Sequence, residues 1–152
     1  FLQLLQLLHT NTTVTTIILS SCSLNDELAA LVSEMLKVNQ HITIFSAPNG
    51  AIEGDGCSAL AEALDGKTNT TLTFLDLFGN MVRVCVSHFQ VPEEGGTALA
   101  KALSSPLCPL QQLNLNDNML TDKGVLPIFE SLRTNVKLQS LAIQGNSITD
   151  AA

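Results

Sequence analysis

Residues 110–120 read LQQLNLNDNML, and the placing of the apolar residues in this stretch decides the fold. Leucines stand at Leu110, Leu113, Leu115 and Leu120, and an asparagine stands at Asn118. An amphipathic helix needs apolar residues at steps of three and four, and a half-exposed strand needs strict alternation. The stretch keeps neither pattern for long, so it predicts a short strand that runs into a tight turn.

The same pattern recurs along the chain. The segments VTTIILSSCSL, ITIFSAPNGAI, LTFLDLFGNMV and LQSLAIQGNSI begin at positions 14, 42, 72 and 138. With the segment at 110, the starts lie 28, 30, 38 and 28 residues apart. Asparagine closes three of the five segments, as Asn80, Asn118 and Asn146, whereas Cys22 and Gly50 take its place in the other two. Self-similarity at such a period predicts a repeat protein.

Each segment except the last is followed by apolar residues at helical spacing. The predicted helices cover residues 26–37, 56–64, 95–103 and 124–132. Asp55 and Asp122 stand where a helix start favours acidic residues. Pro127 is expected near the first turn, where a missing N–H costs little.

Alternating strands and helices predict consecutive strands that run the same way and stack into one core. In this arrangement Leu110, Leu113 and Leu115 point inward, and Leu120 seals the turn into the helix. The turn asparagine both donates and accepts hydrogen bonds, so it can satisfy backbone groups that leave the sheet at the bend. Where Gly50 replaces it, Asn49 is expected to substitute.

The motif L-x-x-L-x-L-x-x-N-x-L with a helix and a 28-residue period resembles the leucine-rich repeat. The helix pattern G-x-x-x-L-x-x-x-L makes the chain similar to the ribonuclease-inhibitor-like subfamily. The resemblance implies an α/β fold, a right-handed leucine-rich-repeat solenoid shaped as a horseshoe arc, with a parallel sheet on the concave face and helices on the convex face. It covers a single domain, 1–152, of about five repeats starting near 14, 42, 72, 110 and 138, with an insertion at 83–92. The sequence at both ends predicts that this chain is a fragment of a longer array of repeats.

Composition argues against several classes of partner. Fourteen acidic residues stand against seven basic ones, giving a net charge of -7, so nucleic-acid binding through a basic face is not expected. No apolar run is long enough to cross a membrane. The four cysteines are scattered without a C-x-x-C pair, which favours reduced thiols in a cytoplasmic protein. The sequons at Asn11 and Asn69 are interpreted as repeated turns rather than glycosylation sites.

Strand positions between the leucines are predicted to face outward on the concave side. These positions are partly apolar in the first three repeats and carry polar amides in the last two. The candidate partner-binding residues are Ile18, Ile44, Phe74, Asp76, Phe78, Gln112, Asn114 and Asn116. An exposed apolar patch of this kind is typical of a protein-binding surface. The alternatives are ordinary sheet residues, or a patch covered by another segment of the protein.

The insertion at 83–92 supplies the second candidate surface, since insertions in solenoids often serve binding. Its candidate residues are Arg83, His88 and Phe89, and the alternative is a neutral surface extension. Cys85 and His88 supply two ligands, which are too few for a zinc site. The glycines of NGAIEGDG lack the rest of a phosphate-binding motif. We therefore expect no catalytic residue, no metal and no cofactor, and the chain is predicted not to be an enzyme.

The preferred hypothesis is a protein-interaction scaffold or ligand-sensing repeat domain that binds a macromolecular partner of unknown identity. Similar repeats occur in NOD-like receptors. One alternative is a GTPase-activating protein, because the Ran GTPase-activating protein has similar repeats; Arg83 is its candidate arginine. A second alternative is cytoskeletal, because SEMLKVN at 33–39 resembles helix ends of the tropomodulin repeat domain.

Overall fold

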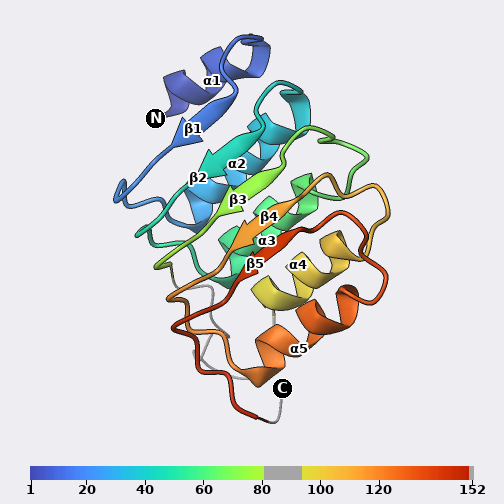
Figure 1. Ribbon diagram of the computed structural model, residues 1–152. Helices are drawn as coiled ribbons and strands as arrows, with labels where there is room; N and C mark the ends of the chain where they lie inside the picture. Colours follow the sequence, from blue (N-terminus) through green and yellow to red (C-terminus); the bar gives the residue numbers. More distant parts are fainter. Residues whose placement is uncertain (81–93, 151–152) are drawn as a thin grey trace.

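The computed structural model describes residues 1–80 and 94–150, and in these ranges helices and strands alternate (Figure 1). The helices are α1 (Leu2–Thr10), α2 (Asp26–Val38), α3 (Gly54–Ala63), α4 (Glu94–Leu103) and α5 (Asp122–Ser131). The strands are β1 (Thr16–Ile18), β2 (Ile44–Ser46), β3 (Phe74–Asp76), β4 (Gln112–Asn114) and β5 (Ser140–Ala142). They form one sheet in the order β1-β2-β3-β4-β5, in which every pair is parallel.

The strands pair without any shift of register. The first residues of the five strands are partners in turn, from Thr16 to Ile44, Phe74, Gln112 and Ser140. Because a shift of one residue would turn every side chain to the other face, equal register keeps equivalent positions of all repeats on the same side. The predicted parallel sheet, and with it the α/β fold class, is confirmed.

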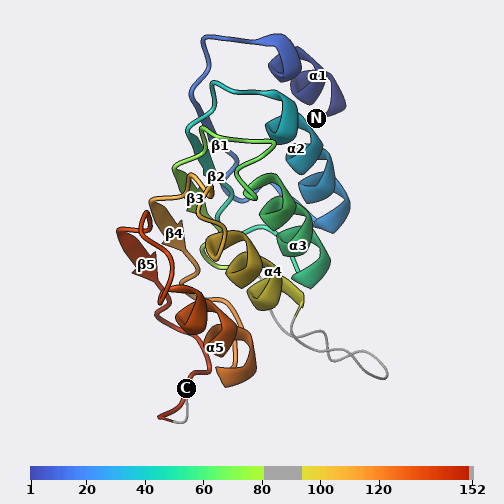
Figure 2. The same ribbon diagram turned by 90° about the vertical axis from the view of Figure 1, so that its right-hand side faces the viewer.

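The molecule has two layers. Figure 2 shows the strands along one side and the helices along the other, with the stack bowed so that the helices lie on its outer side. Each helix from α1 to α4 packs against the next one in the chain, and each strand pairs with the next strand. Contacts between elements therefore run from neighbour to neighbour, as in other repeat proteins.

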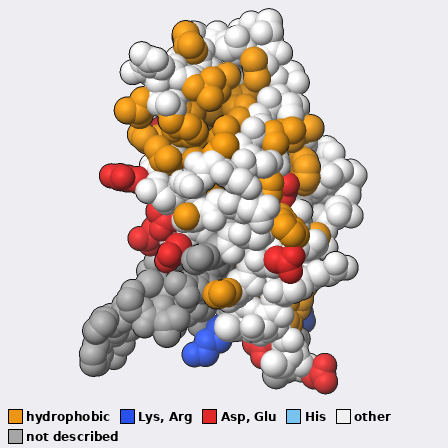
Figure 3. Space-filling view, turned by 90° about the vertical axis from the view of Figure 1, so that its left-hand side faces the viewer, with side chains coloured by type: hydrophobic (Ala, Val, Ile, Leu, Met, Phe, Trp, Pro, Cys, Tyr) orange, Lys and Arg blue, Asp and Glu red, His pale blue; other side chains and the backbone are white. Residues whose placement is uncertain are grey.

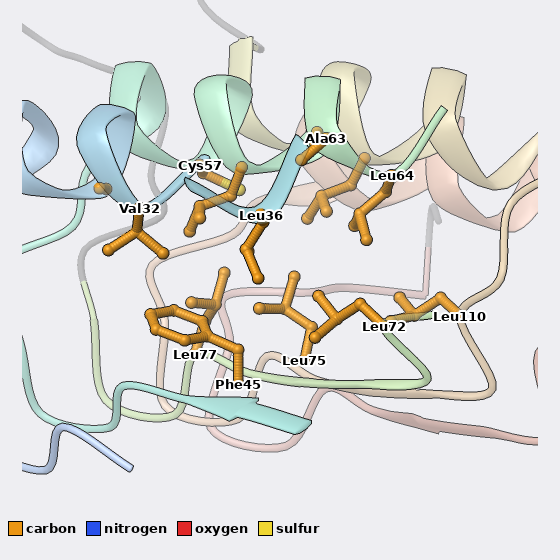
Figure 4. Close-up of a cluster of buried hydrophobic side chains, with 14 of the residues drawn as sticks. Val32, Leu36, Phe45, Cys57, Ala63, Leu64, Leu72, Leu75, Leu77 and Leu110 are labelled. Carbon is orange, nitrogen blue, oxygen red and sulfur yellow. The ribbon is translucent and has the colours of Figure 1, made fainter. Parts of the chain in front are cut away.

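The core lies between the two layers and is almost entirely aliphatic. The central strand residues Phe45, Leu75 and Leu113 are at most 1% exposed. In Figure 4 the sheet side chains point toward residues of the helix layer, among them Leu36 and Leu64. Burying a side chain of this size stabilises the fold by about 2 kcal/mol, so the strand leucines of successive repeats are the main source of cohesion between the layers.

The turn asparagines form a ladder at the end of the strands, as the sequence predicts. Asn80 donates from Nδ2 to the carbonyl oxygen of Ala47 at 2.8 Å and to that of Leu77 at 3.0 Å. Its Oδ1 accepts from the amide of Ile52 at 3.2 Å. Asn118 and Asn146 bond to the preceding repeat in the same way. At Gly50 the expected substitution by Asn49 is wrong: Asn49 is exposed, and Asn80 from the next repeat bonds at this turn.

A second amide ladder, which the sequence pattern did not reveal, lies where helices lead into strands. Asn69 is fully buried and donates from Nδ2 to the carbonyl oxygens of Leu36 and Asn39, at 2.8 and 3.1 Å. Its Oδ1 accepts from the amides of Thr71 and Leu72. Asn39 and Asn135 make equivalent bonds to the repeats before them. The sequence feature that could have predicted this second ladder is an asparagine three residues before the start of a strand pattern, as at Asn11 and Asn69.

The starts of neighbouring helices approach closely. A Cβ atom on Gly56 would lie 2.4 Å from Oδ1 of Asp26, and one on Gly96 would lie 2.1 Å from the carbonyl oxygen of Gly124. Any residue other than glycine carries a Cβ atom, which would prevent these close approaches. The carboxylate of Asp26 then accepts a hydrogen bond at 2.7 Å from the amide of Glu53 in the next repeat. Helix starts are thereby tied together across the stack.

One detail of the sequence interpretation is wrong, and one position departs from the asparagine ladder. Pro127 is the sixth residue of α5, so it lies beyond the first turn and removes the N–H that would bond the carbonyl of Lys123. Cys22, which takes the asparagine position in the first repeat, is exposed. Its thiol contacts only the carbonyl oxygen of Ser20, at 3.4 Å, among the described residues. A thiol donates weakly, and Cys22 does not join the ladder.

Candidate functional site

The eight predicted concave-face residues lie on the side of the sheet away from the helices. In every repeat they alternate with buried residues such as Leu75, Leu77 and Leu113. Strand pairing brings Ile44 beside Phe74 and places Gln112 next in the same row. The structure thus gathers residues from four repeats onto one surface.

The N-terminal half of this surface is apolar. Ile18 is 65% exposed, and Ile44, Phe74 and Phe78 are partly exposed. We call these four residues the apolar patch. They come from three adjacent repeats, so the patch exists only when β1, β2 and β3 are paired.

A hydrogen-bonded row crosses the middle of the same surface. Ser46 Oγ donates to Asp76 Oδ2 at 2.7 Å, and Asn114 Nδ2 donates to Asp76 Oδ1 at 2.9 Å. Ser46 lies on the concave side of β2, but its place in this row leaves it only 8% exposed. Further along the sheet, Asn116 Oδ1 accepts from the amide of Gln144 at 2.7 Å. The polar half of the concave face is therefore held in one geometry.

The predicted insertion lies outside the residues that the structure describes. This holds for the whole segment 83–92, and with it for Arg83, His88 and Phe89. The proposed second binding surface and the arginine on which the GTPase-activator alternative depends both stay predictions.

A hollow that the sequence did not predict lies at the edge where loops enter the strands. It has a volume of about 390 Å³ and is open to solvent. Its lining residues are Thr70, Thr73, Pro109, Gln111, Val136, Lys137 and Gln139. The sequence contains little indication of this hollow, because its lining residues belong to loops that come together only when β3, β4 and β5 pair.

Helix α1 presents a further apolar surface. Phe1, Leu2, Leu4 and Leu7 are between 43% and 71% exposed, whereas Leu5 is buried in the core. Figure 3 shows hydrophobic side chains gathered over the upper, N-terminal part of the molecule. The residues of the apolar patch come instead from β1, β2, β3 and the turn after β3.

Two of the described cysteines, Cys57 and Cys108, are buried and poor nucleophiles, and the third, Cys22, is an exposed free thiol. Burial raises the pKa of the Cys57 thiol to about 12, with a further contribution from the nearby Asp26 carboxylate. Burial also raises the pKa of Cys108. Within residues 1–80 and 94–150, no three His, Cys, Asp or Glu side chains come together as a metal site. No helix in the same ranges is long and apolar enough to span a membrane.

Comparison with known proteins gives matches to one kind of repeat. The Leucine Rich repeat family matches residues 68–82, 107–129 and 134–152. The chain is 26% identical to NACHT, LRR and PYD domains-containing protein 9 of Bos taurus, over 94% of this chain and 16% of that protein. It is 30% identical to ribonuclease inhibitor of Sus scrofa, over 74% of this chain and 22% of that protein.

Leiomodins are also similar. Leiomodin-2 of Homo sapiens is 41% identical over 68 residues, which are 45% of this chain and 12% of that protein. The solved structure of Leiomodin-1 Actin-Binding Site 2 (ABS2) matches with a TM-score of 0.52 and 20% identity, covering 93% of this chain and 61% of that one. At that identity the structural match concerns the fold alone.

The chain spans less than a quarter of the length of each of these curated relatives. What it shares with them is the repeat, which here consists of an in-register parallel sheet, amide ladders at both ends of the strands and glycine at the helix starts. On these grounds the chain belongs to the leucine-rich repeat proteins, and within them to the ribonuclease-inhibitor-like group.

Proposed function

We propose that this chain is a protein-binding repeat scaffold whose concave face receives the partner. The observation that carries the proposal is the apolar patch, Ile18, Ile44, Phe74 and Phe78, displayed on a fixed sheet beside a polar row. Aromatic side chains at the centre of an interface, surrounded by polar groups, are the usual source of binding energy between proteins.

The rigidity of the face supports a binding role. The apolar patch stands on paired strands with buried Phe45 and Leu75 beneath it, so few side-chain and backbone motions need to be frozen when a partner docks. Catalysis has less support. Cys57 and Cys108 are buried with raised pKa values, which disfavours the thiolate at neutral pH. We therefore propose binding rather than chemistry as the role.

We further propose a cytoplasmic location and a place within a longer array of repeats. The described cysteines Cys22, Cys57 and Cys108 are free thiols, which suits a reducing compartment. The five strands begin two residues after positions 14, 42, 72, 110 and 138, and the relatives are much longer than this chain. Additional coils of the same kind would extend the sheet with the same register.

The test compares three proteins as baits: wild type, Phe74→Asp/Phe78→Asp, and Leu7→Asp/Val136→Asp. Both double variants add two acidic residues at apolar positions, but Leu7 and Val136 lie off the concave strands and are 71% and 87% exposed. Retained proteins are quantified by mass spectrometry, and the affinity of each is then measured with purified material. We expect partners kept by wild type and by the control to be lost from the concave-face variant by at least tenfold.

Equal retention by the concave-face variant and wild type would show that the partner uses another surface. Circular dichroism and thermal unfolding of all three proteins establish that loss of binding is not loss of folding.

Actin is a second candidate partner. The specific observation is the 41% identity over 68 residues with leiomodin-2, together with the fold shared with an actin-binding site of leiomodin-1. Purified actin, as monomer and as filament, can be tested directly by sedimentation and by fluorescence. Saturable binding that Phe74→Asp/Phe78→Asp removes would identify actin as the partner. No binding at an actin concentration of about 50 μM, well above the micromolar range of ordinary protein interactions, would exclude it.

A further inference from the structure

Three residues of the third repeat form a column on the concave face. Phe74 and Asp76 lie in β3, and the extended conformation continues beyond it, because the amide of Leu77 donates to the carbonyl of Asn114 at 2.9 Å. Phe78 therefore follows Asp76 on the same face, with Leu77 buried between them. Same-face residues of a strand are about 7 Å apart, so a phenyl ring stands on each side of the carboxylate.

The carboxylate of Asp76 is held in place, and no basic side chain among the described residues forms an ion pair with it. Its oxygens accept from Ser46 Oγ at 2.7 Å, from Asn114 Nδ2 at 2.9 Å and from the amide of Phe78 at 3.1 Å. All three donors are neutral. The ion pairs of the described residues join only Lys37 and Arg133 to glutamates. A carboxylate offers about four acceptor positions, so this one retains capacity for a charged donor.

The surroundings favour a positive ligand. None of the concave strand positions in the described repeats is a lysine or an arginine, and the whole chain carries a net charge of -7. An anionic ligand would be repelled by the carboxylate of Asp76. A purely apolar ligand would cover the carboxylate without giving it a partner, which costs binding energy. A cation with apolar faces can pair with the carboxylate of Asp76 and pack against the phenyl rings of Phe74 and Phe78.

We propose that Phe74, Asp76 and Phe78 bind an arginine side chain of the partner protein. The guanidinium group is planar, weakly hydrated, stacks on aromatic rings and donates to carboxylates. Its contact with a phenyl ring is favourable within about 6 Å of the ring centre, a distance that the spacing of the column allows. The inference rests on the proposed function, because it names the partner chemistry for the same face.

The test uses two synthetic peptides, acetyl-Gly-Leu-Arg-Leu-Gly-amide and the same peptide with citrulline in place of arginine. Citrulline has the same shape without the charge. Binding is followed by ¹⁵N NMR titration of the full chain, which reports both affinity and location. For wild type we expect the arginine peptide to bind about tenfold more tightly, as suits a charge-assisted contact, with shifts at Ser46, Phe74 to Phe78 and Asn114.

The variant Asp76→Asn separates charge from structure. Its amide oxygen still accepts from Asn114 and Phe78, and its NH₂ group can donate to the hydroxyl of Ser46. We expect this variant to fold and to bind the two peptides within about twofold of each other. The matched control is Asp55→Asn, which removes an equal charge from the exposed start of α3 and should keep the tenfold preference.

The outcomes distinguish this inference from the proposed function. Equal binding of both peptides on the concave face would overturn the arginine site and leave the scaffold proposal standing. A preference lost equally in Asp76→Asn and Asp55→Asn would assign the effect to net charge and also overturn it. Shifts confined to other surfaces would count against both proposals.

Discussion

At the scale of single residues, the asparagines show how a polar side chain stabilises a core. Asn69 is fully buried and makes four hydrogen bonds, two as donor and two as acceptor. All its partners are backbone groups at a corner where the chain leaves regular structure. Unpaired groups of this kind are costly when buried. The same burial explains why the sequon at Asn69 is a structural turn, since a buried amide nitrogen is not available for glycosylation.

Replacing Asn69 by alanine removes these bonds and leaves several buried backbone groups without partners. We expect Asn69→Ala to lower the free energy of unfolding by about 3 kcal/mol, measured by urea denaturation. The control is Gln139→Ala at an exposed position, which should change stability by less than about 0.5 kcal/mol. A loss of similar size in both variants would contradict a specific role for the ladder.

Cys57 gives a prediction about pH. Burial, and secondarily Asp26, raises the pKa of its thiol from 9.0 to about 12, so the folded state keeps the proton that the unfolded state releases. The Cys57 thiol therefore leaves stability unchanged below pH 9 and lowers it as pH rises toward 12, by at most about 1.4 kcal/mol per pH unit. Denaturation at about pH 8.5 and about pH 10.5, on either side of the unfolded pKa, should show a smaller fall for Cys57→Ala than for wild type.

Cys22→Ala is the control for this measurement, because Cys22 is exposed. It should follow the wild-type dependence on pH more closely than Cys57→Ala does, since it keeps the buried Cys57 thiol and every lysine. Identical curves for wild type and Cys57→Ala would disprove the effect.

At the scale of elements, helix α5 contains a feature that the sequence pattern alone places wrongly. Pro127 lies in the helix interior, where it lacks the N–H that would bond the Lys123 carbonyl and its ring crowds that carbonyl. The helix forms because Val125 and Ile128 are fully buried in the core. Packing of the apolar face thus outweighs an unfavourable local residue, as it does for many short helices.

Removing this conflict should stabilise the protein. We expect Pro127→Ala to raise the free energy of unfolding by about 1 kcal/mol, because the interior N–H returns while part of the gain is offset by a more flexible unfolded chain. Pro109→Ala is the comparison: Pro109 precedes β4 outside any helix and offers no such gain. Thermal unfolding of both variants measures the difference, and a lower melting temperature for Pro127→Ala would contradict the prediction.

Helix α2 begins with a cap that can be tested in the same way. Asn25 accepts at its side-chain oxygen from the amide of Leu28 at 3.0 Å. We expect Asn25→Ala to cost about 1 kcal/mol, and Asn25→Asp, which keeps the acceptor, to cost less than half of that. Urea denaturation of the pair separates the cap from other effects, and equal losses would argue against it.

At the scale of the whole molecule, stability is shared between neighbouring repeats. The central leucines Leu75 and Leu113 are buried completely or nearly so, whereas Leu141 of β5 is only partly buried. In a stack held by contacts between neighbours, opening begins where burial is least. The strand β5 is paired on one side, with β4, in the described structure.

We therefore expect native-state hydrogen exchange to be fastest in the fifth repeat. Amides of β5 should exchange through openings of lower free energy than amides of β3, by at least about 1 kcal/mol, and β1 should resemble β5 more than β3. Adding a partner at the concave face should slow exchange in β2 and β3 most. Uniform protection across the sheet would mean that the repeats open as one unit.

The spacing of leucines by itself determined the five strands and the buried side of each, because alternation along a strand fixes which way a side chain points. The alternation of strands with helices determined their parallel order. The leucine spacing also determined which residues share the concave face. Only the tertiary structure decided what those residues contact. Ser46 is covered because Asp76 arrives from the next repeat, and Asn69 is satisfied by carbonyls of the preceding repeat. The local sequence pattern sets the face of the sheet to which a side chain points, whereas the burial and hydrogen bonds of that side chain depend on the neighbouring repeat.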